Sequence, residues 1–210
     1  MSVFMHNYIE QIVNVKGNSN HGFQAVFALL DKGEKSHTLV RHTLIQELRS
    51  NKDFYTQLFE NKEKVEELYH SLVPCISGPA PEDEWKRFPE IGHLIEIAYE
   101  RVCIDLTRYG FSEAFFPLRI VPPPNPNDRI ICVGWVLNLR HFVQVSLKLR
   151  YFTPLTSPEW TTHNTIKVET WPDQFVERLQ NFTKLNKIER EINKEKSKGL
   201  SPIDLASVNN

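Results

Sequence analysis

The chain has 210 residues, of which 40% are hydrophobic and 24% are charged, and its formal net charge is −1. This length and composition predict one ordinary globular domain with room for an appendage. The near-neutral charge argues against a nucleic-acid or membrane-surface partner, and no apolar run approaches the roughly 20 residues of a membrane span.

The N-terminal stretch MSVFMHNYIEQIV carries polar and acidic residues where a secretory signal needs a continuous apolar run. We therefore expect an intracellular protein, cytoplasmic or nuclear. The three cysteines Cys75, Cys103 and Cys132 form no CxxC pair, which argues against a disulfide framework or a cysteine-based zinc site. We predict no bound cofactor and no metal.

The first half of the chain is predicted to be mainly helical. The stretch NVKGNSNHGFQAVFALL indicates the end of a strand, a tight polar turn and then a helix. Ser36 can cap the second helix, which should turn Leu39, Val40, Leu44 and Leu48 inward. Prolines and glycine in SGPAPEDEW predict a loop. The expected helices span residues 22–31, 36–49, 51–59, 61–72 and 89–100.

The second half of the chain is predicted to be rich in strands. RVCIDLT alternates, with Val102, Ile104 and Leu106 on one face, and FFPLRI predicts another short strand. RIICVGWVL and HFVQVSLK predict a hairpin of two core strands, since only NLR separates them. Two prolines in FTPLTSPEW predict a loop.

A helical pattern returns from Pro172 to about Lys198, where proline suits the first helical position and Gly199 suits the stop. Its apolar stripe predicts docking on the domain, with partner binding as the alternative. We expect an α+β fold, in which helices pack on a small sheet whose strands come late in the sequence, followed by a C-terminal helix. The predicted parts are an N-terminal segment 1–8, a domain 9–165, and a helical extension with a frayed tail 166–210.

Two motifs together suggest a family. The first is NSNHGFQA at a turn-to-helix corner, and the second is NLRHFVQVSLK, in which His141 opens a core strand. The chain resembles the ovarian tumour (OTU) family of papain-like cysteine proteases, which remove ubiquitin from proteins. The segments SGPAPEDEW and FPEIGHLIEIAYE resemble its plant and fungal branch, part of which is associated with transposable elements.

The resemblance implies roles for particular residues. His141 matches the general base of the family, and Asn20 matches the asparagine before its nucleophile. His21 occupies the position of the nucleophilic cysteine, while Asn18 and Ser19 replace an aspartate at the acid position and a glycine. The turn, including Ser19 and Asn20, is expected to present backbone N–H groups as an oxyanion pocket.

These replacements remove the chemistry of the family. A thiolate at a helix N-terminus is a strong nucleophile, whereas a neutral imidazole attacks amides poorly. The third member of the triad lies two positions after the histidine in some OTU proteases, and Val143, which stands there, cannot orient a ring. Cys103 and Cys132 are expected to be buried in strands, and Cys75 lies at a junction between helix and loop.

Three functions remain open. The first is a catalytically inactive OTU-like domain, a pseudoprotease, that binds ubiquitin or a ubiquitin-like protein. The second is a weak or metal-assisted hydrolase that uses His21 and His141, with His163 as the candidate third ligand. The third is a transposon-derived remnant without selected activity. We expect the His21 and His141 side chains to lie within about 6 Å of each other, the range of a water bridge.

Overall fold

The fold was analysed in a computed structural model of the chain. The structure describes residues 1–15, 21–30, 37–73, 88–107, 111–125, 129–136 and 141–199, and for His21 and residues 197–199 it describes the backbone alone. Several predictions concern residues outside these ranges. They are the Ser36 cap, the loop at 77–85, the environment of Cys75, and the frayed tail.

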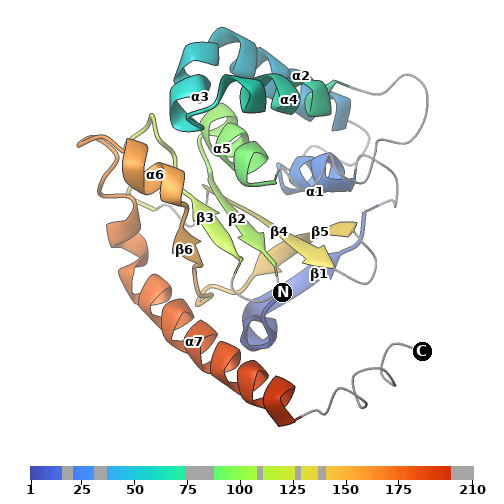
Figure 1. Ribbon diagram of the computed structural model, residues 1–210, viewed down its shortest axis with the longest axis vertical. Coiled ribbons are helices and arrows are strands. Elements are labelled where there is room, and N and C mark those ends of the chain that lie inside the picture. Colours follow the sequence, from blue (N-terminus) through green and yellow to red (C-terminus); the bar gives the residue numbers. More distant parts are fainter. Residues whose placement is uncertain are drawn as a thin grey trace.

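Six strands form one mixed sheet. Their bounds are β1 (Ile9–Val13), β2 (Val102–Leu106), β3 (Glu113–Phe115), β4 (Ile130–Val136), β5 (His141–Leu147) and β6 (Leu155–Thr156). They lie in the order β1-β5-β4-β2-β3-β6 (Figure 1). β5 is antiparallel to both β1 and β4, and β2 is parallel to β4 but antiparallel to β3. The predicted pairing of the two core strands is therefore confirmed.

The helices are distributed on either side of the sheet and at its edge. Their bounds are η1 (Val3–Tyr8, a 3-10 helix), α1 (His21–Leu29), α2 (His37–Ser50), α3 (Lys52–Leu58), α4 (Lys62–Leu72), α5 (Phe88–Tyr99), α6 (Pro158–His163), η6 (Pro172–Phe175, a 3-10 helix) and α7 (Val176–Gly199). α1 packs on β4 and β5, and α5 packs on β2 and β3. α2, α3 and α4 form a further layer outside α1 and α5 (Figure 1).

The α+β class, the small sheet and the C-terminal helix are confirmed. All five predicted helices of the first half are present, because each has apolar residues at a spacing that buries one face. α4 is typical, with Val65, Leu68 and Leu72 buried on one stripe and lysines and glutamates outside. In the part of the chain that the structure describes, no helix combines the length and the apolar character needed to cross a bilayer.

Three details of the sequence prediction are wrong. Leu39 is 51% exposed, because it lies in the first turn of α2, before that helix reaches the core. The strand predicted in FFPLRI ends at Phe115, ahead of Pro117. The loop predicted at 152–160 contains β6 and the start of α6, since Ser157 caps α6 and Pro158 occupies its first position.

The first half of the C-terminal helix α7 packs on the rest of the protein, and its second half is more exposed. Its first half docks on the N-terminal segment, where the ring of Phe182 meets the ring of Phe4 edge-on at 5.3 Å between centroids. Arg178 donates to the carbonyl oxygen of Leu149 at 3.1 Å and stacks on Tyr151. In the second half, the apolar side chains of Ile188 and Ile192 are exposed to solvent. The predicted division of the chain into a segment 1–8, a domain 9–165 and an extension 166–210 stays a prediction.

Candidate functional site

The sheet places His141 beside the helix that begins at His21. His141 is the first residue of β5, and β5 lies between β1 and β4. α1 packs against β5, and its side chains include the buried Phe23 and Val26. The strand that begins at His141 therefore borders the helix that begins at His21, as the resemblance implies.

His141 is held by a backbone carbonyl from the chain that leads into α1. The antiparallel register pairs Val13 with Gln144, so the chain beyond β1 runs past the start of β5. As a result, Nε2 of His141 lies 3.1 Å from the carbonyl oxygen of Val15. Because a carbonyl oxygen only accepts hydrogen bonds, Nε2 carries the proton and donates it. Nδ1 is then the basic nitrogen of the neutral ring.

Burial also sets the protonation of this ring. His141 is only 6% exposed, and burial lowers its pKa below the ordinary value, against the raising effect of the hydrogen bond to Val15. The ring is therefore neutral at pH 7. A neutral imidazole with a fixed tautomer has the form that a general base requires.

Most of the nucleophile corner lies outside the described residues. Asn18, Ser19 and Asn20 are not described, and His21 is described as the first residue of α1 without its side chain. The predicted 6 Å separation of the two histidine side chains and the predicted oxyanion turn therefore stay predictions. The backbone of α1 begins at His21, so this residue stands at the positive end of the helix dipole.

The residue two positions after the base supplies no polar group. Val143 is 2% exposed and pairs with Gly134 on β4, so it is a core residue of the hairpin. The carbonyl of Val15 instead accepts a hydrogen bond from Nε2 and helps to orient the ring. A carbonyl dipole fixes the tautomer but brings no full negative charge to stabilise an imidazolium.

Neither described cysteine can replace the missing nucleophile. Cys103 on β2 is fully buried and Cys132 on β4 is 2% exposed, and both are free thiols. Burial raises the pKa of each thiol well above its usual value. Both thiols are therefore protonated at neutral pH and shielded from substrate, which confirms that they are buried strand residues.

The structure does not bring His163 to His141. His163 ends α6, which follows β6 at the opposite edge of the sheet from the β1–β5 edge. Three strands lie between β5 and β6, and a strand spacing of about 4.8 Å separates these two strands by roughly 19 Å. Within the residues that the structure describes, no three His, Cys, Asp or Glu side chains are grouped to hold a metal ion.

A second buried histidine was not predicted to have polar partners. His93 on α5 is completely buried, and it lies outside the two histidine motifs. Its Nε2 lies 3.1 Å from Oγ of Ser157 and 3.6 Å from Oε2 of Glu159. Its Nδ1 lies 3.5 Å from Oε1 of Glu96, an ion-pair distance without hydrogen-bond geometry. The spacing of His93 and Glu96 on one helix was the signal that could have suggested this pair.

The carboxylates around His93 determine its protonation. Burial lowers the pKa of His93, but Glu159 and Glu96 outweigh that effect and raise it above its usual value. Burial raises the pKa of Glu96 to about 7, while the neighbouring His93 lowers the pKa of Glu159. Ser157 and His93 are both completely buried, so this serine and histidine cannot meet a substrate. The cluster fastens α6 to α5.

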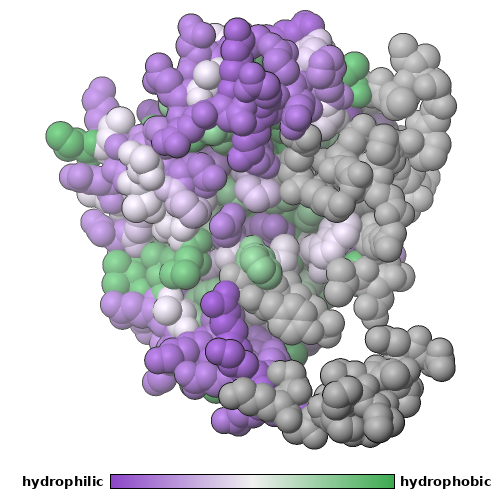
Figure 2. Space-filling model, in the orientation of Figure 1, coloured by the Kyte–Doolittle hydropathy of each residue, from purple (hydrophilic) through white to green (hydrophobic). Residues whose placement is uncertain are grey.

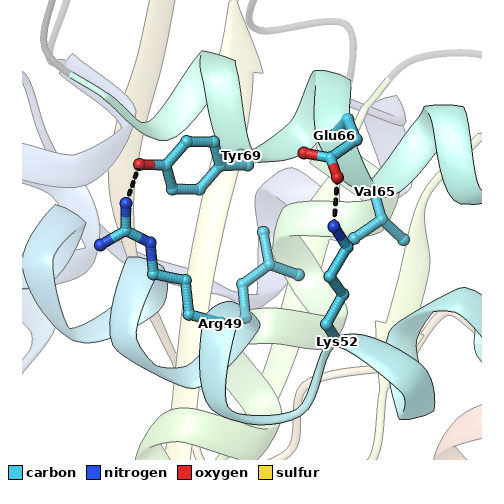
Figure 3. Close-up of a pocket in the computed structure, with 6 residues that line it drawn as sticks. Arg49, Lys52, Val65, Glu66 and Tyr69 are labelled. Atoms are coloured by element: carbon cyan, nitrogen blue, oxygen red, sulfur yellow. Dashed lines mark hydrogen bonds and ion pairs between the residues drawn. The ribbon is translucent and has the colours of Figure 1, made fainter.

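A small hollow of about 240 Å³ lies between α2, α3 and α4 (Figure 3). Arg49 donates to the hydroxyl of Tyr69 on one side, and Lys52 pairs with Glu66 on the other. None of these helices carries a residue of the two motifs, so this hollow is separate from the His141 site. It is lined by Leu48, Arg49, Lys52, Val65, Glu66 and Tyr69.

No protein-family model and no curated protein matches the chain. Among solved structures, the chain is similar to the viral OTU domain protease from Dera Ghazi Khan virus, at 12% identity and a TM-score of 0.47. That alignment covers 68% of this chain and 83% of the viral one. The viral OTU domain protease from Farallon virus is similar at 14% identity and a TM-score of 0.45, over 69% of this chain and 88% of that chain. Likeness at this level does not establish shared chemistry, so function must be argued from the residues of this chain.

Proposed function

We propose that the chain is an OTU-like domain in which histidine replaces the nucleophilic cysteine, and that it binds ubiquitin or a ubiquitin-like protein without cleaving it. The observation that carries the proposal is the packing of helix α1 on strand β5. It brings together the two elements that begin at His21 and His141, the residues on which both sequence motifs centre.

The state of His141 supports a retained scaffold. Its buried ring, lowered pKa and fixed tautomer suit a general base in a papain-like site. The absence of chemistry follows from the residue types. His21 offers no thiolate, and Cys103 and Cys132 are buried with raised pKa values. The proposed role is therefore recognition.

Inertness is tested with an electrophilic ubiquitin probe that captures catalytic cysteines. We expect no covalent adduct and no cleavage of ubiquitin chains by the unaltered protein. Capture of Cys75, Cys103 or Cys132 together with turnover would overturn the proposal. Metal-dependent turnover that disappears in His141→Ala would instead establish the hydrolase alternative.

Placing a cysteine at the position of His21 tests whether the scaffold is that of a protease. His21→Cys places a thiol at the start of α1, where the helix dipole and His141 should lower its pKa. We expect iodoacetamide to modify this thiol at pH 7 faster than Cys103 or Cys132. Asn18→Asp and then Ser19→Gly should increase cleavage further, in a non-additive way, because the residues act as one unit. The matched control is His42→Cys, which places an exposed thiol on α2 and should be modified at pH 7 more slowly than the thiol of His21→Cys.

Binding separates the pseudoprotease from a remnant. Titration of the unaltered chain into ¹⁵N-labelled ubiquitin should shift a contiguous set of ubiquitin resonances. No shift at about millimolar concentration, which corresponds to less than roughly 4 kcal/mol of binding free energy, would favour the remnant.

A further inference from the structure

The middle of α7 forms one wall of a groove that neither sequence motif predicts. A hollow of about 470 Å³ lies between this helix and Leu155 on β6. Within the described part of the sheet β6 is the terminal strand, and Leu155 is 51% exposed. The hollow is lined by Leu155, Thr183, Asn186, Lys187, Arg190, Glu191 and Lys194.

Positive charge predominates along this wall. The chain as a whole has a formal net charge of −1, yet three lining residues are cations and one is a carboxylate. Lys187, Arg190 and Lys194 recur at intervals of three and four residues, so they follow one face of the helix. Figure 2 shows hydrophilic side chains over the lower part of α7, with a hydrophobic patch above them near the start of the helix. A sustained excess of one sign favours a partner of the opposite sign.

The wall also offers apolar and amide contacts. Leu155 supplies a half-exposed aliphatic surface, and the stems of the long cationic side chains extend it. Asn186 is 7% exposed, and an amide both donates to and accepts from a peptide backbone. This combination suits a short peptide with an apolar anchor better than a uniformly charged polymer.

The helix that forms the wall is anchored to the N-terminal segment at two points, Phe182 and Glu189. Phe182 packs on Phe4, and Oε1 of Glu189 accepts a hydrogen bond of 2.7 Å from the backbone N–H of Val3. The lining residues from Thr183 to Lys194 span about 16 Å of helix, the reach of roughly five residues of extended peptide. The wall is therefore held in place before any partner arrives.

We propose that the groove between α7 and β6 binds an acidic peptide segment of a partner protein, with an apolar side chain seated on Leu155. The carboxylates of the peptide pair with Lys187, Arg190 and Lys194. This surface is separate from the proposed ubiquitin-binding function, because neither β6 nor α7 carries a residue of the His21 and His141 motifs.

The test is fluorescence anisotropy of the full chain with the fluorescein-labelled peptide Glu-Asp-Glu-Leu-Asp-Glu-Leu-Glu. We expect saturable binding that weakens at least about fivefold when sodium chloride rises from about 50 to about 300 mM, because exposed ion pairs are screened. Lys187→Ser, Arg190→Ser and Lys194→Ser combined should weaken binding about tenfold or more. Leu155→Ser should weaken binding of this peptide, but not of one with serine in place of both leucines.

The matched control is Lys184→Ser, which removes a cation from α7 outside the lining of the groove. It should leave the affinity within about twofold, since it removes no direct partner. Circular dichroism verifies that each variant keeps its helix. The proposal is overturned if the peptide does not bind at about millimolar concentration, or if Lys184→Ser weakens binding as much as the groove variants. Equal or tighter binding of a labelled oligouridylate would also overturn it, in favour of a nucleic-acid surface.

Discussion

Two buried histidines of this chain sit in opposite electrostatic environments. His141, at the start of β5, meets a backbone carbonyl, and burial lowers its pKa. His93, on α5, meets the carboxyl groups of Glu96 and Glu159, and their charge raises its pKa against the effect of burial. One ring is a neutral base with a fixed tautomer, and the other lies among carboxyl groups that favour its protonated form.

The difference shows why burial alone does not identify a functional histidine. Both rings are at most 6% exposed, so exposure does not separate them. What separates them is the charge of the partner, because a carboxylate stabilises the imidazolium whereas a carbonyl dipole does so only weakly. A base for catalysis must lose its proton near neutral pH, and only the His141 environment favours that.

The largest expected effect is on stability. His93→Leu removes the partner of two carboxyl groups and of Ser157 inside the core, so we expect a loss of about 3 kcal/mol in the free energy of unfolding. His141→Leu removes the hydrogen bond to the carbonyl of Val15, and we expect a loss of about 1 kcal/mol. Urea denaturation measures both. An equal loss in the two variants would show that the carboxylates around His93 are not important for the fold.

A substitution that crowds the core beside His93 should also cost more stability than one on the strand next to His141. A Cβ on Gly92 would lie 2.7 Å from the ring of Phe115, which is buried against His93 and Phe88. We therefore expect Gly92→Ala to cost about 2 kcal/mol in thermal or urea unfolding.

Gly134→Ala, on the strand that pairs with β5, is the matched control. Its Cβ would meet the flexible end of Met1 at 2.8 Å and a methyl group of Val145 at 3.1 Å. A flexible side-chain end moves aside readily, so the expected cost is below about 1 kcal/mol. A larger cost at Gly134 than at Gly92 would reverse the comparison.

The pH dependence of stability should have opposite signs for the two residues. The folded pKa of His93 lies above 6.5, so its stabilisation is fully present below pH 6.5 and is lost as the pH rises through the folded pKa. The folded pKa of His141 lies below 6.5, so its contribution is fully present above pH 6.5 and is lost as the pH falls through the folded pKa.

His93→Gln should therefore destabilise the protein more at acidic than at alkaline pH, and His141→Gln should do the reverse. Urea denaturation from about pH 5 to about pH 9 gives both profiles. Glu96→Gln removes a group whose pKa burial raises to about 7, so it should also flatten the decline in stability between pH 4.5 and 7. Parallel profiles for the two histidine variants would contradict the assignment of their environments.

The smallest effect is spectroscopic. At pH 7 the ¹⁵N chemical shifts of His141 should report a neutral ring with the proton on Nε2, because that nitrogen donates to the carbonyl of Val15. His93 should titrate above His141 in the same spectra. A proton on Nδ1 of His141 would mean that the carbonyl of Val15 does not orient the ring.

Sequence patterns predicted most of the local structure. The periodic apolar residues of α1, α2, α4 and α5, the alternation in β2 and the β-rich runs of β4 and β5 are local signals, and a helix or strand can be inferred from them without knowing the fold. The same patterns missed α6, which is short and lies between prolines and a serine that suggested a loop. The two histidine motifs predicted which residues stand at the start of α1 and β5.

Only the tertiary structure decided what surrounds each histidine. Val15 lies 126 positions from His141, and Ser157 lies 64 positions from His93. Neither contact has a periodic signature, because each arises where strand pairing or helix docking brings distant segments together. A pKa depends on the charges and the burial within a few ångströms of the group, whatever their separation along the chain. Residue types and elements were therefore determined by sequence, whereas the neutral state of His141 and the charged environment of His93 followed from the packing of the sheet and its helices.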